Sequence, residues 1–160
     1  MSVRYSHTNL IARNWKTLAD FYIQVFDCKP TYTTHLSGEY LEKGTGIKSA
    51  VLDGTNLLLP GYENQQLKLE IFQYSELLEK ALPTVPNRLG YGHIAFLVDN
   101  IQKTLKKALE HGGKKIGEIA TQEYKRGIST YIYITDPEGN IIELQNWLPK
   151  YFPHSFFGIM

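Results

Sequence analysis

The chain has 160 residues and a formal net charge of +1, from 17 basic and 16 acidic residues. Its 42% hydrophobic and 21% charged residues are ordinary proportions for a globular protein, which excludes an intrinsically disordered chain. The small net charge gives no long-range attraction to nucleic acid or to an anionic membrane, so we expect neither as a partner.

Cysteine content and hydropathy favour a cytoplasmic protein. The one cysteine, Cys28, cannot form an intramolecular disulfide, which fits a reducing compartment. No apolar run approaches the roughly 18 residues of a membrane-spanning helix, and the residues before His7 lack the apolar core of a signal peptide.

The first unit of the chain is predicted to contain one helix and four strands. A strand over residues 3–10 precedes Asn14, a good helix N-cap, and apolar residues then recur at helical spacing as far as Val25. Lys29-Pro30 is expected to stop this helix. Three further strands are predicted over residues 31–36, 50–59 and 67–73.

A loop over residues 82–90 contains two prolines and is the best linker candidate. The second unit then repeats the order of the first. A strand is predicted over residues 91–98, followed by a helix that Asp99 or Asn100 caps and that ends at Gly112-Gly113. Three strands follow over residues 115–119, 129–135 and 140–146, the last two joined by a turn at 136–139.

The shared order of elements predicts an α+β protein made of two βαβββ modules. His7 and Asn14 recur as His93 and Asn100 at the same spacing. We place the modules at residues 1–80 and 88–147, followed by an aromatic tail at 148–160. The two modules are expected to pair into a curved eight-stranded sheet around a metal cleft.

Each module has a histidine on its first strand and a glutamate on its last: His7 and Glu70, then His93 and Glu143. Because side chains alternate along a strand, Glu70, His93 and Glu143 each lie opposite an apolar face that can pack under a helix. A lone histidine on a strand is most often structural, but four ligand-type residues at equivalent places of a repeat favour a common site. A carboxylate without a partner in an apolar strand would also be costly.

This set of two imidazoles and two carboxylates predicts a site for one divalent metal ion. Mixed nitrogen and oxygen donors suit Ni, Zn, Co, Mn or Fe and are too rich in nitrogen for Ca or Mg. Side chains predicted on the same inner face are expected to shape a substrate pocket: Tyr5, Asn9, Phe72, Tyr91 and Gln145. Tyr131 and Tyr133 alternate together, and pocket lining and simple cross-strand packing explain them equally well.

With these features the chain resembles the vicinal oxygen chelate superfamily of glyoxalases, bleomycin-resistance proteins and dioxygenases. The resemblance is carried by His7-Thr8-Asn9-Leu10, Leu69-Glu70-Ile71, Gly92-His93-Ile94-Ala95-Phe96-Leu97-Val98-Asp99 and Asp136-Pro137-Glu138-Gly139-Asn140-Ile141-Ile142-Glu143-Leu144. It implies a paired βαβββ fold with a metal in a cleft enclosed by eight strands, and a homodimer is common among such proteins.

The resemblance also separates possible activities. Extradiol dioxygenases and fosfomycin-modifying enzymes bind their metal with two histidines and one glutamate. By resemblance, these three ligands would correspond to His7, His93 and Glu143. Bacterial nickel glyoxalase I resembles all four positions, and methylmalonyl-CoA epimerases have a similar set, typically with glutamine at the second. The glyoxalase I arginine and asparagine associated with glutathione binding correspond here to Ile11 and Tyr74, which argues against a glutathione substrate.

The leading expectation is therefore a metal-dependent lyase or isomerase of the glyoxalase type. It would act on a small carbonyl substrate through a metal-stabilised enediolate, with Glu143 or Glu70 moving the proton and Glu143 slightly preferred. The alternatives are a protein that binds a small molecule or drug without chemistry and an extradiol-type dioxygenase. Stoichiometric metal would favour an enzyme, and its lack would favour the binding protein.

Overall fold

The computed structural model describes residues 3–62, 64, 66–80, 82 and 84–150. The first module consists, in chain order, of β1 (His7–Ile11), α1 (Trp15–Phe26), β2 (Lys29–Ser37), α2 (Glu39–Thr45), β3 (Val51–Leu58) and β4 (Lys68–Tyr74). The second consists of β5 (Ile94–Leu97), α3 (Ile101–Glu110), β6 (Lys114–Lys115), β7 (Ala120–Tyr124), β8 (Gly127–Thr135) and β9 (Ile141–Pro149). The predicted aromatic tail from residue 151 onward lies outside the described residues.

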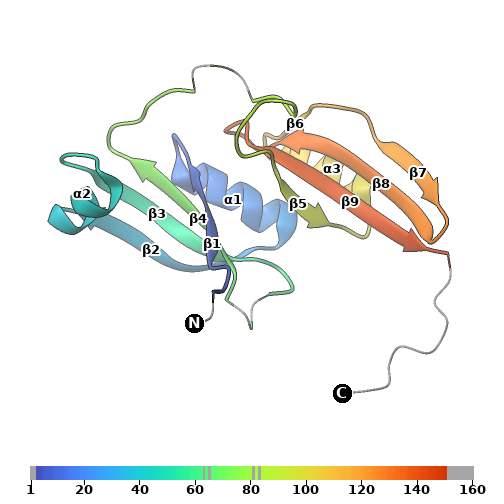
Figure 1. Ribbon diagram of the computed structural model, residues 1–160, viewed down its shortest axis with the longest axis horizontal. Coiled ribbons are helices and arrows are strands. Elements are labelled where there is room, and N and C mark those ends of the chain that lie inside the picture. The colour runs from blue at the N-terminus through green and yellow to red at the C-terminus, as the bar shows by residue number, and fades with distance from the viewer. Residues whose placement is uncertain (1–2, 63, 65, 81, 83, 151–160) are drawn as a thin grey trace.

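The strands form two sheets that lie side by side along the long axis of the molecule (Figure 1). The first sheet has the order β1-β4-β3-β2, and the second has the order β5-β9-β8-β6 with β7 also paired to β8. In each sheet the first strand of the module runs parallel to the last, β1 with β4 and β5 with β9. The predicted α+β class is confirmed, with the strands shared between two sheets, neither of them closed.

Both predicted main helices are present, and an asparagine caps each. The Asn14 side chain accepts hydrogen bonds from the backbone N–H groups of Lys16 and Thr17, both at 3.1 Å. Asn100 rather than Asp99 caps α3, accepting from Lys103 N at 2.8 Å. Side-chain acceptors at this position satisfy N–H groups that have no partner inside the helix, which is why the sequence signal was reliable.

The structure corrects the predicted end of the first helix. This helix ends at Phe26, and the following Asp27 caps it in a left-handed conformation with φ 57°. Lys29-Pro30 opens β2 instead of stopping α1. A proline is tolerated at the start of a strand because few ladder hydrogen bonds are lost there.

Three features of the strands and helices differ from the prediction. Helix α2 lies between Gly38 and Gly46, which have φ 82° and 73°, and Leu41 anchors it on Leu52. A seven-residue helix has too few turns to show a periodic pattern. The strand predicted over 115–119 is instead the two-residue β6 and the separate strand β7, and the strand predicted from residue 3 starts only at His7.

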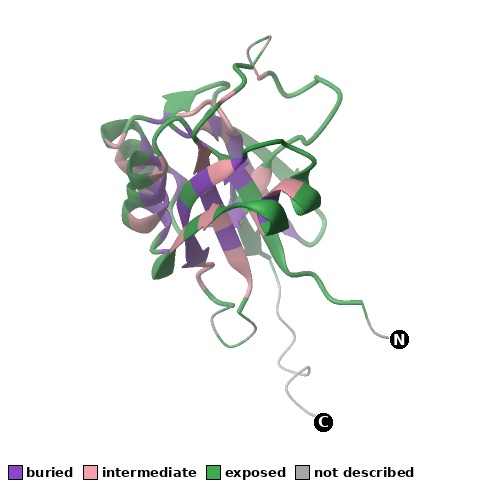
Figure 2. Cartoon of the chain, turned by 90° about the vertical axis from the view of Figure 1, so that its left-hand side faces the viewer, coloured by how far each residue is buried: buried purple, intermediate pink, exposed green. Residues whose placement is uncertain are grey.

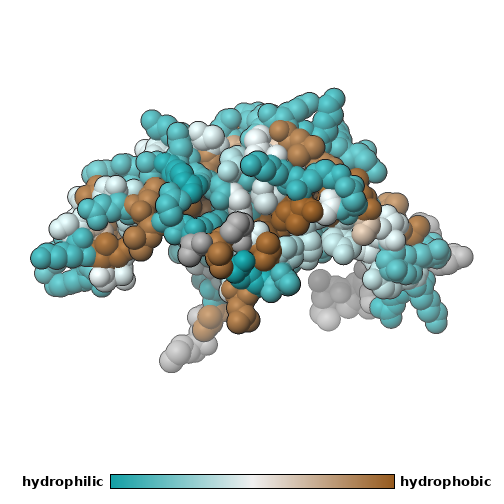
Figure 3. All heavy atoms as spheres, turned by 90° about the horizontal axis from the view of Figure 1, so that it is seen from above, coloured by the Kyte–Doolittle hydropathy of each residue, from teal (hydrophilic) through white to brown (hydrophobic). Residues whose placement is uncertain are grey.

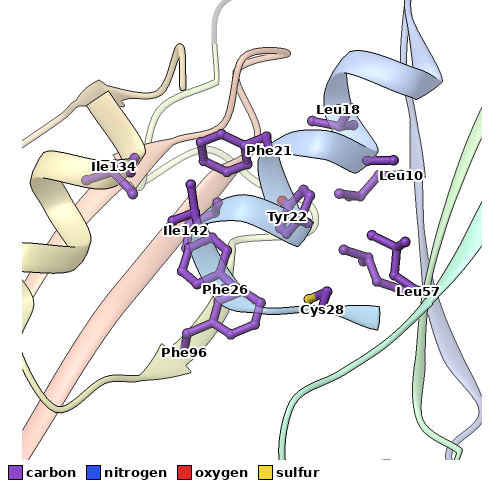
Figure 4. Close-up of a cluster of buried hydrophobic side chains, with 14 of the residues drawn as sticks. Leu10, Leu18, Phe21, Tyr22, Phe26, Cys28, Leu57, Phe96, Ile134 and Ile142 are labelled. Atoms are coloured by element: carbon purple, nitrogen blue, oxygen red, sulfur yellow. The ribbon is translucent and has the colours of Figure 1, made fainter. Parts of the chain in front are cut away.

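The main core is shared by the two modules, and α1 lies at its centre. Leu10 and Leu57 of the first sheet contact one side of this helix, and Ile134 and Ile142 of the second sheet contact the other (Figure 4). At the contact between modules, the ring of Phe26 in α1 stacks on Phe96 of β5, with centroids 4.0 Å apart. Each sheet therefore turns its helix-covered face toward one common core. The opposite face of each sheet turns away from that core.

A buried polar contact also joins the modules. The Tyr22 hydroxyl in α1 donates to Asp136 Oδ2 at 3.0 Å, and both residues are buried. Asp136 in turn accepts from the backbone N–H groups of Glu138 and Asn140, each at 2.9 Å. Glu138 accepts from Arg13 N at 2.8 Å, so the turn that precedes β9 is fastened to the start of α1. The first module thus helps to position β9, on which Glu143 lies.

The buried residues form the interior of the molecule. When the molecule is viewed end-on, down its long axis, buried residues lie in the middle and exposed residues surround them (Figure 2). Seen from above, hydrophobic side chains occur in separate patches among hydrophilic ones (Figure 3). Within the described residues, no helix is both long enough and apolar enough to span a membrane.

Cys28 gives a direct test of this core. Its side chain is buried, and burial, followed by the charge of Asp27, raises the pKa of its thiol to about 12. The thiolate is the nucleophile, so at pH 8 native protein is expected to resist iodoacetamide. Mass spectrometry should detect full labelling only after unfolding in guanidinium chloride. Rapid labelling of the native protein would contradict the burial of Cys28.

Candidate metal centre

The first predicted ligand pair is brought together on the exposed face of the first sheet. His7 and Glu70 lie on the neighbouring strands β1 and β4, in which Asn9 is the register partner of Glu70. His7 Nε2 lies 3.4 Å from Glu70 Oε2, and the two side chains are 43% and 19% exposed. Leu69 and Ile71 point into the core on the other side of β4. The alternation of β4 therefore places Glu70 where a ligand can reach it.

The second pair has the same construction in the second sheet. His93 directly precedes β5, and Glu143 lies on β9 opposite Ala95. The distance from His93 Nε2 to Glu143 Oε2 is 3.0 Å, with side-chain exposures of 35% and 11%. Gln145 donates from Nε2 to Glu143 Oε1 at 2.7 Å. Both carboxylate oxygens of Glu143 thus have a neighbour that orients them.

Tyr133 lies beside this second pair, at a position that sequence reasoning left undecided. It is the register partner of Glu143 on β8, and its ring centroid is 5.1 Å from that of His93. Burial, followed by the negative charge of Glu143, raises the pKa of the Tyr133 hydroxyl. The hydroxyl therefore stays protonated at neutral pH and can donate a hydrogen bond to an oxygen of a ligand. Tyr131 packs edge-on against Tyr133, with centroids 5.7 Å apart.

The structure does not gather all four predicted ligands within one chain. Among the described residues, no group of three or more His, Cys, Asp or Glu side chains is arranged to hold a metal ion. The physical reason lies in the packing, because α1 covers the first sheet, α3 covers the second, and the two helices pack against each other in the shared core. The two His–Glu pairs therefore lie on the uncovered faces of two different sheets.

The predicted pocket residues have different surroundings. Asn9 donates to the backbone oxygen of Glu70 at 3.4 Å, and the Tyr5 hydroxyl is hydrogen-bonded to Thr8 Oγ1. Tyr91 is exposed next to His93. Phe72 packs against the small cluster under α2, and its ring lies over Gly54, where a Cβ would come within 2.5 Å of Phe72 Cδ1. Contact of these side chains with a substrate stays a prediction.

Sequence reasoning overlooked Asn56, the register partner of Glu70 on β3. Its side chain is 1% exposed, and its Nδ2 donates to Thr34 Oγ1 at 3.4 Å. Its Oδ1 is buried without a hydrogen-bond partner among the described residues. An amide directly before the apolar residues Leu57 and Leu58 of β3 was the available signal, since buried polar groups are normally paired.

Comparison with known proteins identifies the family of this chain. A sequence profile of the Glyoxalase/Bleomycin resistance protein/Dioxygenase superfamily matches residues 4–144. The chain belongs to this superfamily. No curated protein matches the chain.

Several solved structures share the superfamily fold. A glyoxalase family protein from Bacillus cereus is similar at a TM-score of 0.80 and 19% identity, covering 92% of this chain and 96% of that one. A glyoxalase family protein from Enterococcus faecalis gives 0.58 and 22%, covering 89% and 96%. A mutant of the fosfomycin resistance protein FosX from Listeria monocytogenes, in complex with Mn(II) and 1S,2S-dihydroxypropylphosphonic acid, gives 0.57 and 18%, covering 91% and 93%.

Membership in the superfamily does not by itself assign a subgroup. Ile11 and Tyr74 are the two residues that argue against glutathione binding. Ile11 is partly exposed at the end of β1, and Tyr74 packs against the cluster under α2. Neither side chain carries a charge that could pair with a glutathione carboxylate.

Proposed function

We propose that this protein is a metal-dependent lyase or isomerase of the glyoxalase type, acting on a small carbonyl compound. One observation carries the proposal: an imidazole and a carboxylate are paired at the equivalent place of each module, His7 with Glu70 and His93 with Glu143. Such a pair on an open sheet face costs side-chain freedom and solvation, which binding of a cation would offset.

The chemistry of these side chains fits a divalent transition metal. The two pairs together offer two neutral nitrogens and two carboxylates, a set that suits Ni, Zn, Co, Mn or Fe. The Mn(II) in the superfamily member FosX supports an ion of this class. When bound, such an ion polarises the oxygen of a carbonyl group.

The side chains of the second module would carry out the proton transfer. In the proposed reaction, Glu143 takes a proton from the carbon next to the carbonyl group and returns it. Gln145 holds Glu143 Oε1 at 2.7 Å, which fixes the direction of the carboxylate. The protonated Tyr133 hydroxyl would donate to a substrate oxygen. Glu70 is the alternative base, and its side chain is the more exposed of the two glutamates.

A second copy of the chain would complete the site, because one chain presents its two pairs on separate faces. Apolar side chains around the second pair are exposed, among them Tyr91, Leu97 and Tyr131. Leu97 is 75% exposed on the same face of β5 as Ala95. In a two-fold dimer, His7 and Glu70 of one copy would meet His93 and Glu143 of the other, giving two equal sites.

The test combines metal analysis with mixing of two inactive chains. Wild-type protein purified without chelator is expected to contain about one divalent ion per chain. His7→Ala and His93→Ala should each lose it. If the two variants are unfolded together and refolded at equal amounts, about a quarter of the wild-type metal content should return, because half of the dimers are mixed and each restores one site.

The outcomes separate the alternatives. A site built within one chain would recover no metal in the mixture, and a monomer by sedimentation would reject the shared site. Wild-type protein without stoichiometric metal would favour a protein that sequesters small molecules. Iron together with oxygen consumption in the presence of a catechol would favour a dioxygenase.

A further inference from the structure

A polar cleft of about 950 Å³ lies where β1 and β4 begin, next to the first His–Glu pair. Its lining includes Arg4, Tyr5 and Ser6 before β1, and Gln66 and Lys68 around the start of β4. All five side chains carry hydrogen-bond donors, and two of them are cations. The cleft is therefore lined mainly by hydrogen-bond donors, with the Leu67 side chain and backbone carbonyls as the exceptions. Such a lining suits a ligand that is rich in hydrogen-bond acceptors.

The two cations of this cleft, Arg4 and Lys68, have no acidic partner within the described residues, whereas several other basic side chains form ion pairs. Arg13 is paired with Glu138 at 2.8 Å, and Lys115 with Glu118 at 2.7 Å. Glu70, which shares a strand face with Lys68, is paired with His7 instead. The charges on Arg4 and Lys68 are thus available to a ligand.

Lys68 is held in place without being neutralised. Its Nζ lies 5.8 Å from the centroid of the Tyr32 ring on β2, a contact that orients an ammonium group and leaves its charge intact. His7 and Lys68 are register partners on β1 and β4, and Lys68 and Glu70 are two residues apart on the same face. A ligand that reaches the His7–Glu70 pair therefore has Lys68 as a neighbour.

We propose that Arg4 and Lys68 bind an oxyanion of the substrate, a carboxylate or a phosphonate or phosphate group, at the edge of the metal centre. The substrate is then a small acidic carbonyl compound. Its anionic group would lie in this cleft while its carbonyl group lies at the neighbouring His7–Glu70 pair. The identity of the substrate rests on the proposed function, whereas anion binding in the cleft can be measured without metal.

The experiment uses full-length protein stripped of metal with EDTA. Saturation-transfer NMR titrations would compare acetate and methylphosphonate with acetamide, which has the shape of acetate but no charge. Both anions are expected to bind more tightly than acetamide, and to weaken as NaCl rises from about 20 to about 200 mM. Arg4→Gln/Lys68→Gln should lower anion affinity about tenfold or more, because two contacts to a charged group are lost. The stronger of the two anions identifies the chemical class of the group.

The matched control is Lys125→Gln/Arg126→Gln in the turn between β7 and β8, which makes the same change in net charge at two exposed residues. Its anion affinity should stay within about twofold of wild type, since remote surface charges act weakly. Equal affinity in the Arg4/Lys68 variant and wild type, no preference for either anion over acetamide, or no saturable anion binding would overturn the subsite. Anion binding in a protein that takes up no metal would reject the metal centre and leave the subsite standing.

Discussion

Glu143→Gln is expected to lower turnover by about 10²- to 10⁴-fold while the protein keeps most of its metal. The amide retains an oxygen that can bind a cation, but it cannot accept the proton that a carboxylate accepts. Turnover would be followed by ¹H NMR in D₂O, as deuterium uptake at the carbon next to the carbonyl in a panel of small α-hydroxy carbonyl compounds. Metal content would be measured on the same samples.

Two further variants make this result specific. Glu110→Gln on α3 changes an exposed carboxylate far along the chain from both pairs and should leave turnover and metal unchanged. Glu70→Gln identifies which glutamate is the base, since the larger loss of turnover at equal metal content marks that residue. If Glu143→Gln loses metal and turnover to the same extent, Glu143 holds the metal and does not move the proton.

Phe96→Ala is expected to destabilise the whole chain by about 3–5 kcal/mol. Phe96 is 8% exposed and stacks on Phe26 of α1, so the truncation leaves a cavity at the contact between the modules. Because one core holds both modules, they should unfold in a single transition. Unfolding would be followed by tryptophan fluorescence in urea titrations at one protein concentration. The Trp15→Phe variant keeps only Trp147 and reports on the second module, and the Trp147→Phe variant keeps only Trp15 and reports on the first.

The aromatic control is Tyr40→Ala on α2, where the side chain is 84% exposed. It should change stability by less than about 0.5 kcal/mol. Two separate transitions in the single-tryptophan proteins, or a loss at Phe96 no larger than at Tyr40, would show that the modules fold independently and that α1 does not join them.

Local patterns in the sequence predicted much of the fold. Asparagine caps located the starts of α1 and α3, since the capping hydrogen bonds involve only residues close in the chain. The short helix α2 was missed, and the strand predicted over 115–119 proved to be the two separate strands β6 and β7. Their formation depends on contacts with distant residues, such as Leu41 with Leu52 and Ala120 with Tyr131.

For the candidate site, strand alternation was enough to predict which side of each strand Glu70 and Glu143 occupy, because it leaves Leu69 and Leu144 for the core. The sequence predicted one common site for all four side chains, whereas the structure places each glutamate beside the histidine of its own module. The relative orientation of the modules, in contrast, depends on packing between distant segments. Periodicity shows that a strand has an apolar face but not what that face packs against. Here α1 covers the first sheet, α3 covers the second, and the two helices pack against each other. The two His–Glu pairs are therefore separated within one chain.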